Sequence, residues 1–177
     1  MASIKDGFDY DNSGEERKGN WMQTFTGRQF WPLDPRPEEV FIEDIAHALS
    51  MACRYGGHCE RFYSVAEHSI YVSLHVPEEL SLMGLLHDAS EAYVADVIRP
   101  IKPSLVGYKE IENKVWSAIA KRFHIPSIMP DDIKVADNAV LLAESEQIMK
   151  PHPAPWCVDG DPADIEIQCL SPSDAKS

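Results

Sequence analysis

The strongest constraint on the fold is the stretch 78–94, in which the adjacent residues His87 and Asp88 interrupt an almost entirely apolar sequence. Its length and its many Leu, Met and Ala residues predict a helix within a helical core. A buried polar side chain is costly unless it is hydrogen-bonded or bound to a metal ion. We therefore expect His87 and Asp88 to have buried partners. Glu91, four residues after His87, is expected on the same face of this helix, one turn further along.

A second histidine, His68, lies near the beginning of another expected helix, 64–75. Ser64 and Glu67 have the spacing of a capping box, in which each of the two side chains satisfies a backbone N–H of the first turn. This start of the helix fixes His68 within its first turns.

A third predicted helix, 131–149, has an apolar stripe that contains Asp137. A carboxylate in such a stripe is uncommon without a partner. Taken singly, a buried His is usually a hydrogen-bonded core residue, and an Asp is usually a cap or an ion-pair partner. Together, two imidazoles and two carboxylates from three helices are the donor set that suits Mn, Co, Fe, Ni or Zn. The candidate metal ligands are His68, His87, Asp88 and Asp137.

A cation held by these groups keeps open coordination positions, lowers the pKa of a bound water and neutralises the charge of a phosphate group. Glu91 can orient or deprotonate that water, and Asp96 can hold the water or handle a proton for the leaving oxygen. Lys102 and Lys109 are candidate phosphate clamps, although exposed lysines are more often only solvated. These residues indicate metal-assisted hydrolysis of a phosphate ester.

The order of the candidate ligands resembles that of the HD-domain phosphohydrolases, which are named for their His-Asp doublet. The resemblance extends from about Trp21 to Glu146. It is closest to the bacterial 5′-deoxynucleotidases and their phage relatives, which include dATP triphosphohydrolases of phages that replace adenine by 2-aminoadenine. The doublet alone is a weak signal, and the combined strings are a strong one. These strings are Ala66-Glu67-His68-Ser69, Leu85-Leu86-His87-Asp88-Ala89-Ser90-Glu91-Ala92 and Asp96-Val97-Ile98-Arg99-Pro100-Ile101-Lys102.

The resemblance implies a role for each matching residue. It implies that the two His and two Asp ligands hold one divalent metal ion, that Glu91 activates water and that Asp96 assists. Arg54 and Tyr55 stand near the position of an Arg-aromatic pair that recognises the nucleotide; the family more often has Trp in place of Tyr55, and the spacing here is one residue shorter. Pro100 stands where relatives have a Pro close to the base or the sugar. The implied substrate is a deoxynucleotide, cleaved between phosphorus and the 5′ oxygen.

Length and composition agree with such a protein. The 177 residues fit one domain that can bury a full core. A net charge of −13 argues against polymeric nucleic acid as a partner, but not against a small charged substrate. The four cysteines lack C-x-x-C spacing, which favours reduced thiols and excludes a structural Cys/His zinc site. With no apolar signal core and no membrane-length stretch, we expect a cytoplasmic protein that does not contact a membrane.

We expect an all-α fold, a single HD-domain helical bundle over 21–150 with irregular N- and C-terminal segments. Further helices are expected at 42–54 and 108–123. Residues 1–20 are predicted to be a flexible tail and 151–177 an irregular one. The protein is also expected to form a homo-oligomer, a dimer or larger.

Several alternatives stay open at this point. A non-catalytic metal- or nucleotide-binding HD module is the competing function, and the presence of Glu91 and Asp96 favours the enzyme. The sequence does not distinguish a monophosphate from a triphosphate substrate, or Co, Mn, Mg, Fe, Ni and Zn as the metal. His47 and His58 are expected to have ordinary hydrogen-bonding roles.

Overall fold

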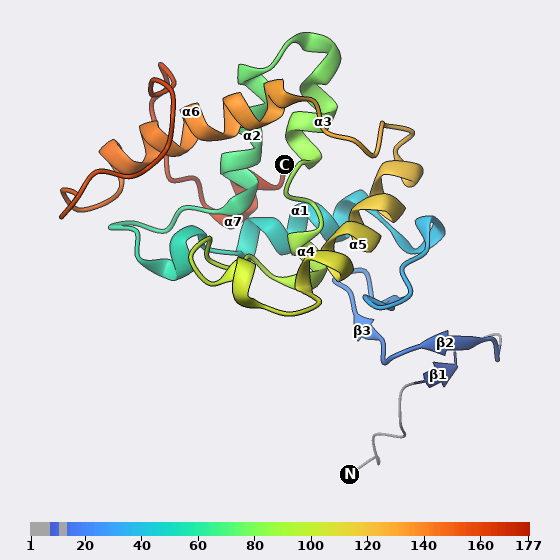
Figure 1. Ribbon diagram of the computed structural model, residues 1–177. Helices are drawn as coiled ribbons and strands as arrows, with labels where there is room; N and C mark the ends of the chain where they lie inside the picture. Colours follow the sequence, from blue (N-terminus) through green and yellow to red (C-terminus); the bar gives the residue numbers. More distant parts are fainter. Residues whose placement is uncertain (1–7, 11–13) are drawn as a thin grey trace.

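The computed structural model describes residues 8–10 and 14–177 of the chain. Most of its regular structure is helical (Figure 1), which confirms the expected class. The helices are α1 (Ile42–Met51), α2 (Val65–His75), α3 (Ser81–Leu86), α4 (Glu91–Val94), α5 (Tyr108–Arg122), α6 (Asp131–Gln147) and α7 (Pro172–Ala175). Among the described residues, no helix combines the length and the apolar character needed to cross a membrane.

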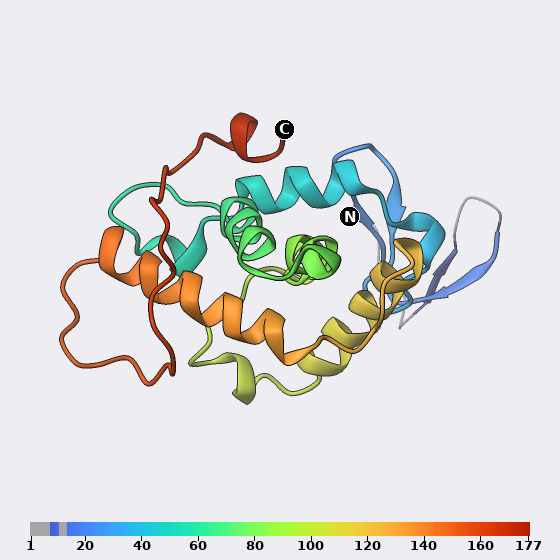
Figure 2. The same ribbon diagram turned by 90° about the horizontal axis from the view of Figure 1, so that it is seen from above.

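The core is built around α2 and α3, which pack against each other between α1 and α6 (Figure 2). Gly84 of α3 makes this packing possible. A Cβ at Gly84 would lie 3.0 Å from the Cα of Ser73 on α2, so a larger side chain would push the two helices apart. The site residues on these helices are therefore held by close backbone packing.

The expectation of one continuous helix over 78–94 is wrong. A 3-10 turn at Glu78–Leu80 precedes α3, and a turn at 87–90 separates α3 from α4. The apolar pattern did not reveal this break, because successive tight turns can bury the same side chains as an α-helix. His87 and Asp88 consequently lie just beyond the end of α3 rather than inside a helix.

The hydrogen bonds of this turn explain where its side chains point. The backbone N–H of Ala89 donates to the Leu86 carbonyl at 2.8 Å, and that of Glu91 donates to the Asp88 carbonyl at 2.9 Å. Both bonds span three residues, and side chains three residues apart align in such turns. Glu91 therefore shares a face with Asp88, and its expected alignment with His87 is wrong.

The chain before α1 forms two short antiparallel hairpins. They pair β1 (Phe8–Tyr10) with β2 (Glu16–Lys18) and β3 (Met22–Gln23) with β4 (Gln29–Phe30). Arg17 of β2 is buried, donates to Asp34 at 2.8 Å and to Glu39 at 2.5 Å, and lies over the Trp31 ring. In the described part of 1–20, Arg17 anchors β2 to Asp34 and Glu39, while β1 pairs with β2 alone. The expected flexibility of this part of the chain stays a prediction. The same expectation for residues 1–7 and 11–13 lies outside the described residues.

The C-terminal segment is irregular apart from α7, close to the expectation for 151–177. The buried carboxylate of Glu67 holds it in place by accepting the backbone N–H groups of Gln168, Cys169 and Leu170 at 2.7 to 3.1 Å. The capping box is confirmed in one half only. The Ser64 hydroxyl accepts the N–H of Glu67 at 3.1 Å, while the Glu67 side chain binds the C-terminal segment.

Candidate metal centre

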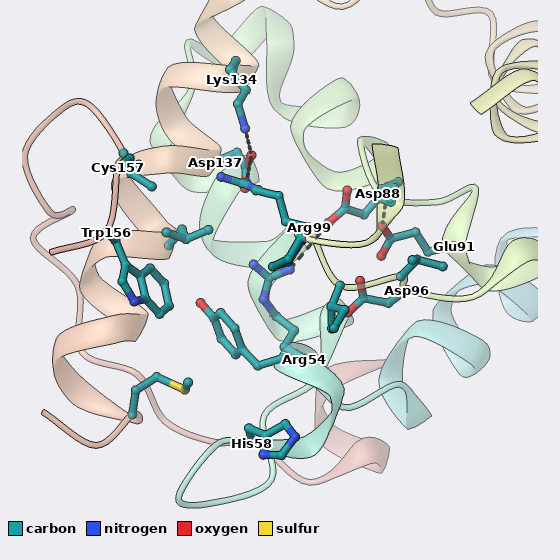
Figure 3. A pocket seen from close by; sticks show the side chains of 18 residues that line it. Arg54, His58, Asp88, Glu91, Asp96, Arg99, Lys134, Asp137, Trp156 and Cys157 are labelled. Atoms are coloured by element: carbon teal, nitrogen blue, oxygen red, sulfur yellow. Dashed lines mark hydrogen bonds and ion pairs between the residues drawn. The ribbon is translucent and has the colours of Figure 1, made fainter. Parts of the chain in front are cut away.

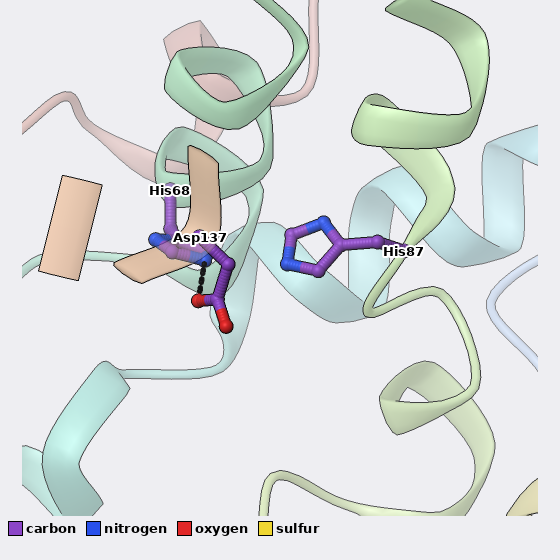
Figure 4. Close-up of side chains that lie close together, drawn as sticks. All are labelled: His68, His87 and Asp137. Carbon is purple, nitrogen blue, oxygen red and sulfur yellow. Dashed lines mark ion pairs between the residues drawn. The ribbon is translucent and has the colours of Figure 1, made fainter. Parts of the chain in front are cut away.

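The four expected ligands come together from three parts of the fold. His68 lies on α2, Asp137 on α6, and His87 just after α3 (Figure 4). Asp88 follows His87 and is labelled in Figure 3. Ligand atoms of His68, His87 and Asp137 all lie within 4.8 Å of one another. The Nε2 atom of His68 is 3.4 Å from Oδ1 of Asp137 and 3.8 Å from Oδ2 of Asp88. The same Asp88 oxygen is 3.3 Å from Nε2 of His87.

Each imidazole ring is oriented by a hydrogen bond at its Nδ1 atom, on the side away from the candidate metal position. Nδ1 of His68 lies 2.5 Å from a carboxylate oxygen of Glu144, and Nδ1 of His87 lies 2.7 Å from the carbonyl oxygen of Gly84. Both partners are acceptors, so each Nδ1 carries the proton and a neutral ring has its lone pair on Nε2. A hydrogen bond of this kind is the usual support of a metal-binding histidine.

The two Nε2 atoms have no hydrogen-bond partner within the described part of the chain, although both are buried. Each faces a carboxylate oxygen 3.3 to 3.4 Å away, which would place lone pair against lone pair unless a positive charge lies between them. For His68 a proton can supply that charge. Burial and Arg54 lower the pKa of His68, but Glu144 and Asp137 raise it by more, so the pKa lies above its usual value. The donor set equally fits a divalent cation with mixed nitrogen and oxygen ligands.

Both aspartates are ionised at neutral pH. Burial alone would raise the pKa of Asp88 and Asp137, but the adjacent histidines hold each pKa well below its usual range. The Oδ2 atom of Asp137 accepts from Lys134 Nζ at 2.6 Å and lies 3.6 Å from Arg99. Its Oδ1 atom is the one that faces His68, so one oxygen is anchored and the other is directed at the candidate metal position.

Glu144, which was not among the expected residues, joins the candidate metal centre to Arg54 and Tyr55. It is fully buried and accepts from Arg54 Nε at 3.2 Å, from the Tyr63 hydroxyl at 2.9 Å and from the Tyr55 hydroxyl. Burial would raise its pKa, but Arg54 and His68 lower it to about 2. Its sequence signal was its position seven residues after Asp137, two helical turns along the same face.

The two expected acid–base residues, Glu91 and Asp96, lie beside the ligands. Burial raises the pKa of both, and the negative charges of Asp88 and Asp96 bring that of Glu91 to about 9. Lys102 Nζ, 3.5 Å from Glu91 Oε1, offsets only part of this effect. This cluster of carboxylates therefore favours any added positive charge nearby.

The backbone before Asp96 is strained. Ala95 has φ 67° and ψ 152°, a conformation found essentially only in glycine. Its carbonyl accepts from the Tyr108 hydroxyl at 2.8 Å, which helps to hold the conformation. The kink ends α4 and directs the chain so that Asp96 lines the site.

A cavity of about 790 Å³ adjoins the metal centre (Figure 3). Both candidate aspartate ligands and both expected acid–base residues line it, as do the expected substrate residues Arg54, Tyr55, Pro100 and Lys102. Its volume lies within the range of ligand pockets, about 300–1,000 Å³. The pocket and the metal centre thus form one continuous site.

The expected phosphate-binding lysines differ in position. Lys109 is exposed, is absent from the cavity lining and pairs with Glu112 at 3.1 Å, so the structure does not bring it to the site. Lys102 lines the cavity but also pairs with Glu112, at 2.6 Å. Two cations not anticipated from the sequence, Arg99 and Lys134, line the cavity next to Asp137. Lys134 lies one turn before Asp137 on α6, and this spacing was its sequence signal.

Comparison with known proteins places the chain in a family of bacterial proteins. No family model matches the sequence. The uncharacterized protein YfdR of Escherichia coli K12 is 36% identical over 145 residues, covering 81% of this chain and 82% of that protein. The uncharacterized protein RCAP_rcc00048 of Rhodobacter capsulatus is 37% identical over 145 residues, covering 74% of each. The chain therefore belongs to the same family as YfdR.

Proposed function

We propose that this protein is a metal-dependent phosphohydrolase of deoxynucleotides with an HD-domain metal centre. One observation carries the proposal. Two buried imidazole Nε2 atoms, each fixed from behind and without a hydrogen-bond partner in the described structure, face two ionised carboxylates beside a cavity of about 790 Å³. Such a donor set suits Mn, Co, Fe, Ni or Zn, and Mg is the further candidate.

When bound, the divalent cation supplies positive charge that acidifies a water ligand and neutralises phosphate charge. That charge would also lower the pKa of Glu91, which is raised by its carboxylate neighbours. Glu91 then accepts a proton from the attacking water as the water oxygen bonds to phosphorus. The bond from phosphorus to the 5′ oxygen breaks, and Asp96 helps to return a proton to that oxygen.

The cations of the cavity support a phosphate ester as the substrate. Arg54, Arg99, Lys102 and Lys134 line it although the chain has a net charge of −13. Arg54 is held by Glu144 and lies 3.7 Å from Asp88, so it contributes charge more than free hydrogen-bond donors. Arg99 is largely exposed and can turn toward a phosphate.

Tyr55 supports a deoxyribose rather than a ribose. Its hydroxyl is engaged by Glu144, so its ring lines the cavity without a free polar group. A ribose 2′-hydroxyl against such a ring would be crowded and without a partner. A 5′-nucleotidase and a triphosphohydrolase break the same bond, so the proposal covers both deoxynucleoside monophosphates and triphosphates as substrates.

A direct test compares deoxynucleoside mono- and triphosphates as substrates. Protein freed of metal is given Mn²⁺, Co²⁺ or Mg²⁺, and the released phosphate or triphosphate is identified. We expect hydrolysis only with a metal and faster hydrolysis of deoxynucleotides than of ribonucleotides. A protein that binds metal but hydrolyses none of these compounds would instead be a non-catalytic binding module.

A further inference from the structure

The irregular segment after α6 forms one wall of the cavity. Met149, Trp156, Cys157 and Val158 line it. Trp156 and Cys157 lie across the cavity from Asp96 (Figure 3). This segment lies beyond the part of the sequence that resembles HD-domain phosphohydrolases. Its contribution to the cavity is therefore a feature of this chain that the metal centre does not explain.

Neighbouring side chains hold Trp156 in this wall of the cavity. Its ring stacks on His152 with centroids 4.9 Å apart and planes 8° apart, and Nε2 of His152 donates to the Ser145 carbonyl of α6 at 3.3 Å. On its other flank, the ring lies 5.9 Å from that of Tyr55 at an angle of 49°. Two neighbours from different segments thus hold the indole, which Figure 3 shows at the cavity.

The residues nearest to this corner would favour a flat apolar group. The rings of Tyr55 and Trp156 meet at an angle, and Met149 and Val158 extend the same lining. The charged groups that would hold a phosphate, Arg99 and Lys134, lie instead beside the metal ligand Asp137. A nucleotide has the same division, with a charged phosphate at one end and an aromatic base at the other.

We propose that Trp156 is a specificity-determining residue that stacks on the base of the nucleotide, with Tyr55 as the adjoining wall. This inference rests on the proposed function and deepens it. His152 stacks on the indole, while Trp156 and the tilted Tyr55 ring both line the cavity, where a base would contact them. Stacking is tolerant of base identity because every base has an aromatic face. It favours purines over pyrimidines, since their ring area is larger.

The test uses two probes that the enzyme cannot hydrolyse. The metal-loaded protein is titrated with 2′-deoxyadenosine, which has the base and no phosphate, and separately with inorganic phosphate. In Trp156→Leu, which keeps an apolar side chain, we expect roughly tenfold weaker binding of deoxyadenosine, as loss of one base stack implies. Phosphate binding should be unchanged, and Trp156→Phe should recover most of the lost affinity.

Trp21→Leu is the matched control, because Trp21 is partly exposed and is not among the cavity residues. It should bind deoxyadenosine as the wild type does. Unchanged binding of deoxyadenosine by Trp156→Leu, or equal losses for deoxyadenosine and phosphate, would overturn the inference. So would a wild type that binds phosphate but no deoxynucleoside. Hydrolysis is measured separately, so that a failure of the proposed function is distinguishable from a failure of the stacking role.

Discussion

Replacing Glu144 by Gln tests the network behind the metal centre most severely. Oε1 of Glu144 faces His68 Nδ1 and the Tyr63 hydroxyl, and Oε2 faces Arg54 Nε and the Tyr55 hydroxyl. Whichever way the amide turns, its NH₂ group faces two donors. The substitution keeps the volume of the side chain and removes its charge.

The magnitude follows from the burial of the ion pair. Glu144 is fully buried and Arg54 nearly so, and the next carboxylate, Asp88, lies 3.7 Å from Arg54. Breaking a buried pair by removing one partner costs about 3–5 kcal/mol. That is a large part of a total stability of about 5–15 kcal/mol. Because Glu144 also orients His68, metal affinity should fall by roughly 10- to 100-fold.

The assay is urea unfolding of the metal-free protein at neutral pH, with metal affinity measured by titration. Glu146→Gln is the control, since Glu146 is exposed on the same helix and its loss should change stability by less than about 0.5 kcal/mol. The double variant Glu144→Gln with Arg54→Met should recover part of the loss, because no buried charge is left unpaired. A Glu144→Gln protein within about 1 kcal/mol of the wild type, with unchanged metal affinity, would refute the reasoning.

The same substitution has a pH dependence of known sign. The pKa of Glu144 is lowered from 4.5 to about 2, so its contribution to stability is fully present above pH 4.5. This contribution is lost as the pH falls through the folded-state pKa. The difference in stability between wild type and Glu144→Gln should therefore shrink from pH 5 toward pH 2. A difference that is constant over this range would contradict the account.

Three further substitutions give separate readouts. Glu91→Ala should keep the metal but lower turnover by roughly two to four orders of magnitude. Turnover and metal content are measured on the same sample. A variant with wild-type turnover would assign the role of general base to Asp96 or to water alone. Tyr55→Ala should narrow the ratio of deoxy- to ribonucleotide kcat/KM more than it lowers total activity, and a wild type with equal rates on both would contradict the proposal. Gly84→Ala should lower stability by about 1–3 kcal/mol, because its methyl group would meet the Ser73 backbone. Thermal unfolding measures this effect, and an unchanged midpoint would rule out the close contact.

The helical class and the helical positions of candidate ligands such as His68 and Asp137 could be predicted from local signals. The Ser64 cap begins the helix that holds His68, and the apolar stripe of α6 includes Asp137. These signals concern residues a few positions apart in the sequence. They are reliable because helix starts and helix faces depend on near neighbours.

The turn at 87–90 could not be predicted in this way. The apolar residues on either side of it continue the pattern of one helix, and the difference lies in hydrogen bonds that span three residues instead of four. The pairing of Glu67 with the C-terminal segment and the burial of Arg17 were also missed. Both contacts depend on segments that are distant in the sequence or have no periodicity.

The metal content of the protein tests the central claim most directly. After loading with Mn²⁺ and dialysis, elemental analysis should give about one ion per wild-type chain. The control Asp132→Ala, which removes an exposed carboxylate of α6, should bind the same amount. Asp88→Ala should retain its helical circular dichroism and bind almost no metal, because it lacks the carboxylate oxygen that faces both histidines. A wild type without metal, or an Asp88→Ala protein with a full equivalent, would contradict the assignment of these residues as a metal centre.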